Sequence, residues 1–274
     1  MAELTEKEAR LTAVLSSFDS LLVAYSGGVD SAYLACAASR VLPGRVLCVT
    51  ADSPSYPKRH REMAEDVARR FSLAHEFVMT AELERPEYRA NPANRCYHCK
   101  TELYEHLSKV ATERGIGMIA DGSNADDRGD YRPGRQAARE FGVRSPLDEV
   151  DLSKEEIRAL SRQAGLPTWN EPASACLSSR IPYHSEVTEE KLRTIEAAER
   201  VLRDLGFRVC RVRHHDTIAR LELGREEIAR ALEPATAEAI DRGLRALGYA
   251  HVTVDLRGYR LGSLNDALKL RPVE

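Results

Sequence analysis

The sequence lacks three features that mark large classes of protein: an excess of basic residues, a long apolar run and a hydrophobic leader. Its 274 residues contain 40 Lys and Arg against 43 Asp and Glu, a formal net charge of −3. Proteins whose main function is to bind nucleic acid usually carry an excess of basic residues, so we expect no nucleic-acid partner. No apolar run approaches the roughly 18–20 residues of a membrane helix. The charged start MAELTEKEAR is unlike a signal peptide, which predicts a soluble, cytoplasmic protein with no membrane partner.

The composition also argues against disorder and against a disulfide framework. Apolar residues make up 43% of the chain and charged residues of both signs 30%, which suits a globular protein with a core. Its six cysteines suit a reducing compartment, where disulfides are rare. Cys36, Cys48 and Cys210 fall within apolar segments, and we expect them in the core. Only the remaining three cysteines lie in polar segments.

Short apolar runs alternate with amphipathic stretches over about the first 165 residues. We predict helices over 5–18, 30–41, 57–71, 100–114 and 153–165, and strands over 21–25, 46–50, 75–79, 116–120 and 143–145. Ser153, followed by Glu156, predicts a capping box at the start of the last helix. Alternation of this kind is typical of a parallel sheet with helices on both faces, whose ligands bind at the carboxyl ends of the strands.

The pattern changes after a Pro-containing stretch at 166–186. We predict helices over 188–206 and 234–247, a hairpin of strands 209–213 and 217–223, and a strand over 251–256. The expected fold is therefore α/β, a parallel sheet flanked by helices, with a smaller C-terminal α+β domain. Its parts are an α/β domain at 1–165, a linker and active-site loop at 166–186, and the small domain at 187–274.

A Gly-rich turn joins the first buried strand to a helix with little polar content. It reads Ser26-Gly27-Gly28-Val29-Asp30-Ser31. Two glycines let a ligand approach the backbone, and the helix amides and serine hydroxyls favour an anion. The turn is neither a Walker A loop nor GxGxxG. Its strand–turn–helix setting predicts a phosphate site rather than an ordinary capped turn.

Three cysteines on two polar stretches form the second chemical feature. Cys96 and Cys99 make a CxxC at a helix start, and Cys176 lies in a small-residue loop beside Arg180. Three thiols suit a [4Fe–4S] cluster with one open iron better than structural zinc, which takes four ligands. Two alternatives stay open: a reactive Cys176 beside a structural or redox pair, and no metal at all.

The Gly-rich turn resembles the loop of the PP-loop ATP pyrophosphatase superfamily, and the chain as a whole resembles the LarE family. The segments that carry the second resemblance are Ser26–Ser31, Ala51–Tyr56, Asn91–Lys100, Asp121–Asp127, Asp130–Gly134 and Cys176–Tyr183. The superfamily implies an adenine nucleotide alpha hydrolase fold and cleavage of ATP between its α and β phosphates. The family implies sulfur transfer in the biosynthesis of the nickel-pincer nucleotide cofactor of lactate racemase.

The LarE resemblance also implies the reaction and its sulfur source. Members adenylate the carboxylates of pyridinium-3,5-biscarboxylic acid mononucleotide with ATP and Mg²⁺ and replace the oxygen by sulfur, in two rounds. In one type, the cysteine matching Cys176 gives up its own sulfur and becomes dehydroalanine. Others carry three cysteines and use a cluster with an added sulfide. Because Cys96, Cys99 and Cys176 fit the second type, we expect the cluster, with the sacrificial Cys176 as the alternative.

Several polar residues are candidates for binding the nucleotide. By the resemblance, Ala51 and Ser53 lie near adenine and ribose, and the alternative is a simple loop. Asp30 is a candidate Mg²⁺ ligand. Lys100 suits a phosphate, or is a solvated lysine at a helix start. Asn124 and Asp126 follow a strand end, where they contact substrate or metal or else form an Asx turn.

Three arginines are candidates for the sulfur-transfer chemistry. Arg180 would stabilise the Cys176 thiolate and the nucleotide phosphate; its alternative is a surface salt bridge. Arg211 and Arg213 alternate on one strand, and the resemblance implies that they bind the substrate phosphate. Their alternative is a solvated basic strand face. The resemblance also implies a homo-oligomer that hands its product to a nickel-inserting enzyme.

Two other functions compete with this interpretation. One is another PP-loop enzyme, a tRNA thiolase or an amide-forming synthetase, which the net charge of −3 and the lack of a recognisable RNA-binding module disfavour. The other is a non-enzymatic nucleotide sensor on the same scaffold, since a fold does not fix a function.

Overall fold

The computed structural model describes residues 2–129, 132–172, 175–260 and 262–266. The chain folds into two compact units, one of Met1–Glu82 and Asn94–Ser174 and the other of Leu83–Ala93 and Ala175–Glu274. The short segment 83–93 thus belongs with the C-terminal part, although the chain on both sides of it belongs to the first unit. The boundaries 1–165, 166–186 and 187–274 do not anticipate this excursion, and as domain boundaries they stay a prediction.

The first unit is built on a parallel four-stranded sheet with the order β3-β2-β1-β4. Its strands are β1 (Leu21–Ala24), β2 (Val46–Asp52), β3 (His75–Met79) and β4 (Met118–Ala120). The predicted strand at 143–145 is reduced to one parallel bridge between Ala120 and Arg144. Because all strands run the same way, the loops that follow them gather at one edge of the sheet.

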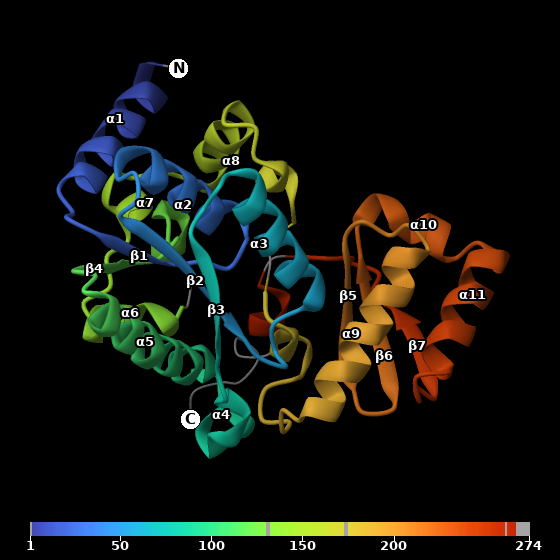
Figure 1. Cartoon of the computed structure of the whole chain (residues 1–274). Helices are drawn as coiled ribbons and strands as arrows, with labels where there is room; N and C mark the ends of the chain where they lie inside the picture. The colour runs from blue at the N-terminus through green and yellow to red at the C-terminus, as the bar shows by residue number, and fades with distance from the viewer. Residues whose placement is uncertain (1, 130–131, 173–174, 261, 267–274) are drawn as a thin grey trace. The chain divides into compact units, whose positions relative to one another are not determined.

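Helices cover both faces of this sheet, as the alternation along β1 shows. Leu21 and Val23 pack in one core with α1 (Ala2–Ser16), α2 (Val29–Val41), α3 (Lys58–Arg70) and α8 (Lys154–Gln163). Leu22 and Ala24 pack in another with residues of α5 (Arg95–Arg114) and α6 (Gly134–Glu140). Figure 1 shows α5 and α6 on the side of the sheet opposite to α2. Successive side chains of a strand point to opposite faces, so four apolar residues in a row predict burial on both.

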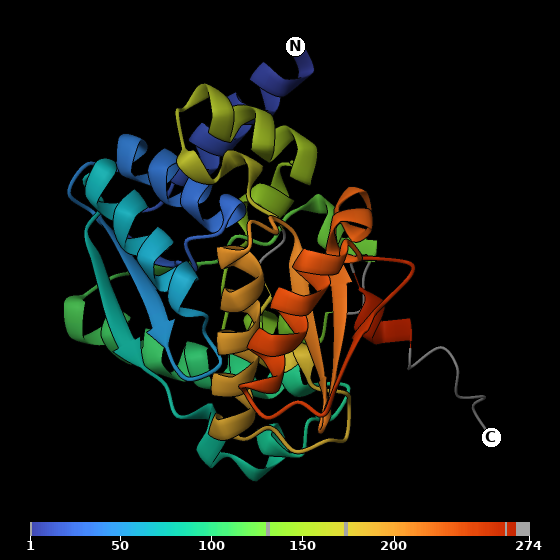
Figure 2. The same ribbon diagram turned by 90° about the vertical axis from the view of Figure 1, so that its right-hand side faces the viewer.

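The second unit has a three-stranded sheet with the order β5-β6-β7. The strands β5 (Cys210–His215) and β6 (Ile218–Leu223) form the predicted antiparallel hairpin, and β7 (His251–Val254) pairs in parallel with β6. The helices α9 (Glu189–Asp204) and α11 (Pro234–Arg245) pack on one face of this sheet (Figure 2). The predicted fold class, α/β with a small α+β part, is confirmed.

Most predicted elements form within a few residues of their expected bounds, and the capping box of Ser153 with Glu156 is present. The helix predicted over 100–114 begins earlier, at Arg95, so that it contains Cys96 and Cys99. The short helices α4 (Pro86–Arg89), α6, α7 (Pro146–Glu149) and α10 (Ile228–Ala231) were not predicted, because four to seven residues carry too little periodicity. Within the described ranges, none of the helices has the length and apolar character that a bilayer crossing needs.

Candidate active site

The Gly-rich turn between β1 and α2 has the geometry of an anion-binding loop. Gly27 adopts a φ of +68°, and a Cβ there would lie 2.8 Å from the Cα of Ala64 in α3, so the position requires glycine. Gly28 is the N-cap residue of α2 and supplies no side-chain cap. The first amides of α2 are therefore left for a ligand at the positive end of the helix dipole, which favours phosphate.

Two serines fix the shape of this loop. The backbone N–H of Ser26 donates to Oγ of Ser31 at 3.1 Å, and the two hydroxyl oxygens also lie 3.1 Å apart. The Ser31 hydroxyl donates to the carbonyl of Gly28 at 3.2 Å. Ser31 is buried, and its hydroxyl forms hydrogen bonds within the loop, whereas Ser26 is exposed. Ser26 is thus the hydroxyl of the pair that faces solvent.

The loop after β4 packs directly against the start of α2. A Cβ on Gly122 would lie 2.9 Å from the backbone N of Ser31, so the two segments touch backbone to backbone. Asp121, buried at the end of β4, accepts hydrogen bonds from the hydroxyls of Ser145 at 2.8 Å and Tyr104 at 3.0 Å. These contacts set the loop's position beside the Gly-rich turn. The sequence marked this segment only by resemblance.

Asp30, in the first turn of α2, forms an ion pair with Lys154 at the start of α8. Its other carboxylate oxygen, Oδ1, is buried with no hydrogen-bond partner among the described residues. Carboxylate oxygens are the ligands that Mg²⁺ prefers, usually one or two of them together with substrate phosphates. The chemistry of this oxygen fits a magnesium ion, and the role of Asp30 as its ligand stays a prediction. Lys154 was missed in the sequence, where it is one lysine at an ordinary helix start.

The residues after Gly122 form a tight hydrogen-bonded turn. The side-chain oxygen of Asn124, a residue 3% exposed, accepts from the backbone N–H of Asp126 at 3.1 Å, which is an Asx turn. Oδ2 of Asp126 accepts from the backbone N–H of Lys154 at 2.9 Å. Burial raises the pKa of Asp127, although its ion pair with Arg132 acts in the opposite direction. The Asx-turn alternative is thus observed for Asn124, and a ligand role for either residue stays a prediction.

The turn after β2 contacts the Gly-rich loop. The Tyr56 hydroxyl donates to the carbonyl of Ser26 at 2.9 Å, and the backbone N–H of Tyr56 donates to the carbonyl of Ser53 at 3.0 Å. Ala51 and Ser53 are both half-buried, and Asp52 between them is ion-paired with Arg61. The turn after β2 therefore lies beside the Gly-rich turn, and contacts of Ala51 and Ser53 with the nucleoside stay a prediction.

The CxxC lies in the first two turns of α5, with Cys96 exposed and Cys99 half-buried. The ammonium of Lys100 lies 5.4 Å from the centre of the Tyr104 ring. A Cβ on Gly134 would lie 2.9 Å from Cγ of Lys100, so the start of α6 packs closely on this helix. Gly134, the last residue of the motif Asp130–Gly134, thereby adjoins the CxxC helix, and Asp130 and Tyr131 lie outside the described residues.

In the second unit, Arg180 stabilises the loop that carries Cys176. It is 1% exposed and pairs bidentately with Glu199, through Nε to Oε1 at 2.8 Å and Nη2 to Oε2 at 3.2 Å. Its Nη1 donates to the carbonyls of Ala175 at 2.9 Å and Cys176 at 3.0 Å. Ser174, just before, lies outside the described residues. The surface salt bridge considered for Arg180 is wrong because the pair is buried, and its catalytic role stays a prediction.

Arg213 supports the same loop from β5. It is 6% exposed, donates to the carbonyl of Ser179 at 2.6 Å and pairs with the buried Glu222 at 2.6 Å. Arg211 is half-buried and lies 5.2 Å from the ring centre of Tyr259. Burial, and then the nearby Arg180, lower the pKa of Arg211. A solvated basic face is therefore the wrong description of Arg213, and phosphate binding by the two arginines stays a prediction.

The other three cysteines behave as core residues. Cys36, Cys48 and Cys210 are all buried, and burial raises their thiol pKa values to about 11, about 12 and about 11. Thiols that stay protonated at neutral pH are poor nucleophiles and poor metal ligands. The separation of the cysteines into a buried and an accessible set is confirmed.

Among the described residues, no three His, Cys, Asp or Glu side chains lie close enough together to hold a metal ion. Cys96 and Cys99 belong to the first unit and Cys176 to the second, so a shared cluster stays a prediction.

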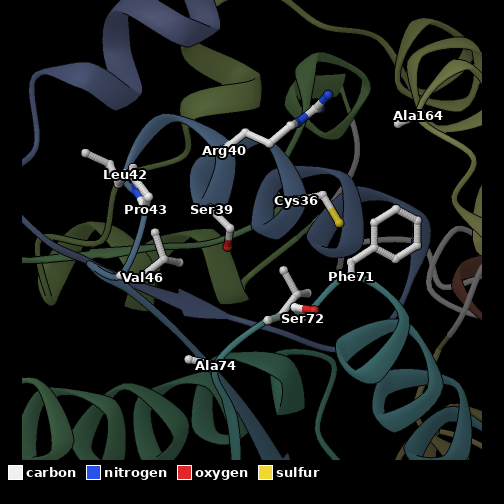
Figure 3. Close-up of a pocket in the computed structure, with 12 residues that line it drawn as sticks. Cys36, Ser39, Arg40, Leu42, Pro43, Val46, Phe71, Ser72, Ala74 and Ala164 are labelled. Atoms are coloured by element: carbon white, nitrogen blue, oxygen red, sulfur yellow. The ribbon is translucent and has the colours of Figure 1, made fainter.

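A pocket of about 420 Å³ in the first unit is lined by the end of α2 and the turn after α3, with Cys36 and Phe71 among its side chains (Figure 3). Val46, at the start of β2, places this pocket at the amino ends of the strands, away from the phosphate loop.

A parallel sheet whose first strand leads through a Gly-rich phosphate loop into a helix, without a Walker lysine, defines a PP-loop ATP pyrophosphatase. The family model for asparagine synthase matches residues 13–91, which contain β1, the Gly-rich loop and β2. The chain is 44% identical to an uncharacterized protein of Synechocystis, covering 97% of this chain and 99% of the relative. It is 26% identical to an uncharacterized protein of Methanocaldococcus jannaschii over 88% of this chain and 90% of that protein.

A further relative has a named activity. The chain is 37% identical to the pyridinium-3,5-bisthiocarboxylic acid mononucleotide synthase of Lactiplantibacillus plantarum, over 98% of this chain and 97% of the relative. Identity of this extent runs through both compact units rather than the loop alone. The chain belongs to the LarE family.

Proposed function

We propose that this protein is an ATP-dependent sulfur transferase that adenylates the carboxylates of pyridinium-3,5-biscarboxylic acid mononucleotide and converts them to thiocarboxylates for nickel-pincer nucleotide synthesis. The observation that carries the proposal is the 37% identity over 98% of the chain with a protein named for making the bisthiocarboxylic product. The uncapped start of α2 and the Gly27 turn support ATP as the activating substrate.

The first step is adenylation. A substrate carboxylate oxygen attacks the α phosphorus of ATP, the bond to the β phosphate breaks, and pyrophosphate leaves. The amides of α2 and the Ser26 hydroxyl hold the departing pyrophosphate, and the ammonium of Lys154, at the start of α8, lies beside Asp30 in the first turn of α2. Asp30 would hold the magnesium ion, which would neutralise phosphate charge. Activation replaces oxide, a poor leaving group, by AMP, a good one.

The second step is sulfur transfer. A sulfur nucleophile in its deprotonated form attacks the activated acyl carbon, a carbon–sulfur bond forms, and AMP leaves with one of the former carboxylate oxygens. Arg180 fixes the backbone on both sides of Cys176 and so orients this cysteine. Arg211 keeps a cationic group in the same unit, where the substrate phosphate would bind.

The sulfur source we propose is a [4Fe–4S] cluster held by Cys96, Cys99 and Cys176. These are the three accessible cysteines of the chain, and their thiols fit the donor type that such clusters require. A bound cluster would supply sulfide at its open iron. The alternative donor is Cys176 itself, which would end as dehydroalanine.

The experiment incubates anaerobically purified protein with ATP, Mg²⁺ and the pyridinium mononucleotide and follows pyrophosphate, AMP and the product mass. We expect one pyrophosphate and one AMP for each oxygen replaced by sulfur. Pyrophosphate formation that instead requires tRNA, and falls steeply with salt, would identify a tRNA thiolase. An amide product formed with an amine donor would identify a synthetase, and ATP binding without any pyrophosphate would identify a sensor.

The wider setting is proposed from the family resemblance. The protein would act in the cytoplasm as a homo-oligomer and pass its product to the nickel-inserting enzyme of the same route. Measuring the molecular mass in solution tests the homo-oligomer, and product transfer in a mixture of the two purified proteins tests the handover to the nickel-inserting enzyme.

A further inference from the structure

A buried glutamate, Glu82, organises the turn that follows β2. It begins the 3₁₀ helix η1 (Glu82–Glu84) and is 2% exposed. Its Oε1 accepts hydrogen bonds from the hydroxyls of Ser53 and Ser55, each at 2.5 Å, and its Oε2 accepts one from Thr80 at 3.0 Å. Three hydroxyls thus converge on one carboxylate inside the first unit.

This arrangement fixes the direction of the Ser53 hydroxyl. The hydroxyls of Ser53, Ser55 and Thr80 each donate to Glu82, and a hydroxyl has a single proton to give. The Ser53 oxygen lies 3.0 Å from the Ser55 hydroxyl and accepts from the backbone N–H of Ser55 at 3.3 Å, which leaves one lone pair for a further partner. Ser55 is 4% exposed, whereas Ser53 is half-buried and reaches the surface. Ser53 therefore presents an acceptor, and not a donor, at the end of β2.

The position of Ser53 relative to the phosphate loop is set by contacts within the same unit. Tyr56, in the same turn, donates to the carbonyl of Ser26, and β2 pairs directly with β1. On the other side of β1, the loop after β4 brings Asp126 to Lys154, the partner of Asp30. These charged groups suit the phosphates and Mg²⁺. A nucleotide with its phosphates on α2 and its nucleoside on the β2 side would reach Ser53.

We propose that Glu82 is a positioning residue that makes Ser53 a hydrogen-bond acceptor for a donor group of the nucleoside of ATP. The inference rests on the proposed use of ATP. Two groups of the nucleoside have this chemistry: the 6-amino group of adenine and the ribose hydroxyls. In both cases the site rejects a nucleoside that offers an acceptor, or nothing, at that position.

The test measures the equilibrium binding of ATP, ITP, 2′-deoxy-ATP and 3′-deoxy-ATP, each with Mg²⁺, to the full-length protein. ITP has a carbonyl oxygen where ATP has the amino group, and the deoxy analogues each lack one ribose hydroxyl. We expect one of the three analogues to bind at least about tenfold more weakly than ATP, because the Ser53 oxygen is left without its donor in that complex. The identity of that analogue tells base recognition from ribose recognition.

Variants then assign the discrimination to these residues. Ser53→Ala removes the acceptor and should bind ATP and the rejected analogue equally. Glu82→Leu releases the Ser53 proton and should also lose the discrimination, while Glu82→Gln keeps an acceptor oxygen and should restore it. Thr80→Val is the matched control, because it removes a Glu82 hydrogen bond without touching Ser53. It should discriminate like the wild type.

The outcomes separate this inference from the proposed function. Wild-type protein that binds ATP and all three analogues equally overturns the inference, as does discrimination that survives in Ser53→Ala. If folded Glu82→Leu still binds ATP more tightly than the rejected analogue, Glu82 does not set the direction of the Ser53 hydroxyl. Should Glu82→Leu fail to fold, the Ser53→Ala and Glu82→Gln measurements still decide the matter. Wild-type protein that does not bind ATP at all rejects the proposed function and this inference with it.

Discussion

Arg180 and Glu199 form a bidentate ion pair in which neither side chain is more than 3% exposed. The same guanidinium also bonds the backbone carbonyls of Ala175 and Cys176. One buried pair therefore joins helix α9 to the loop of the cysteine on which the proposed chemistry depends. Burying two charges is costly, and it is compensated here because every arm of the guanidinium has an acceptor.

Glu199→Ala should leave the buried guanidinium of Arg180 without its counter-charge. We expect the free energy of unfolding to fall by about 3–5 kcal/mol, as when one partner of a buried pair is removed. Arg193→Ala on the same helix is the control, because its pair with Glu189 is exposed and should change stability by less than about 1 kcal/mol. Urea denaturation followed by circular dichroism measures both. Equal, small effects would show that the pair contributes little.

The same pair predicts a pH dependence. Burial raises the pKa of Glu199, but the charge and hydrogen bonds of Arg180 outweigh burial and hold it below its usual value. A carboxyl with a lowered pKa stabilises the fold above the unfolded-state pKa of about 4.3, and this contribution is lost as the pH falls through the folded-state pKa. The stability difference between wild type and Glu199→Gln should therefore be constant from about pH 7 to pH 5 and narrow below about pH 4.3. Denaturation curves across this range check it, and a difference that widens on acidification would contradict it.

Gly27→Ala tests the phosphate loop. The φ of +68° and the 2.8 Å approach to the backbone of Ala64 mean that an added methyl must displace the loop or α3. We expect ATP affinity to fall at least about tenfold, because the α2 amides move away from the phosphates. Gly142→Ala is the matched control, since its φ is +64° but nothing lies within 4 Å of the added Cβ. It should lose about 1 kcal/mol of stability and bind ATP normally. Calorimetric titration with ATP separates the two results.

The features that could be predicted well from the sequence depend on residues that lie close together in the chain. The run Leu21–Ala24 predicts a strand buried on both faces, and the glycines after it predict the loop. The buried and accessible cysteines also separate on local polarity. What escaped prediction depends on residues far apart in the chain.

Glu82 contacts Ser53, and Glu199 contacts Arg180, only in the folded chain. Nothing in the sequence around these glutamates distinguishes them from the others. Lys154 looks like any lysine that opens a helix until Asp30 lies beside it. Arg180 illustrates the limit most clearly. Its neighbour Cys176 marked it as interesting, yet its burial follows from Glu199 on another element, so a surface salt bridge was a reasonable and wrong alternative.

The accessible cysteines give the prediction that bears most directly on mechanism. Protein purified without oxygen should be brown and contain about four irons and matching sulfide per chain. Cys96→Ala, Cys99→Ala and Cys176→Ala should each lose the iron, because three thiolates are the fewest that hold such a cluster with one iron open. Cys36→Ala is the control: this thiol is buried, with its pKa raised to about 11, and its loss should leave the iron content unchanged.

The intact mass before and after turnover then distinguishes the two sulfur sources. Cluster-borne sulfur leaves the polypeptide mass unchanged, since the transferred atom is not part of the chain. A colourless protein that is active and loses the mass of H₂S at Cys176 has given up its own sulfur, and the cluster proposal is then wrong. In that case, the exposed position of Cys96 at the start of α5 needs another explanation, and Cys96→Ala should turn over like the wild type.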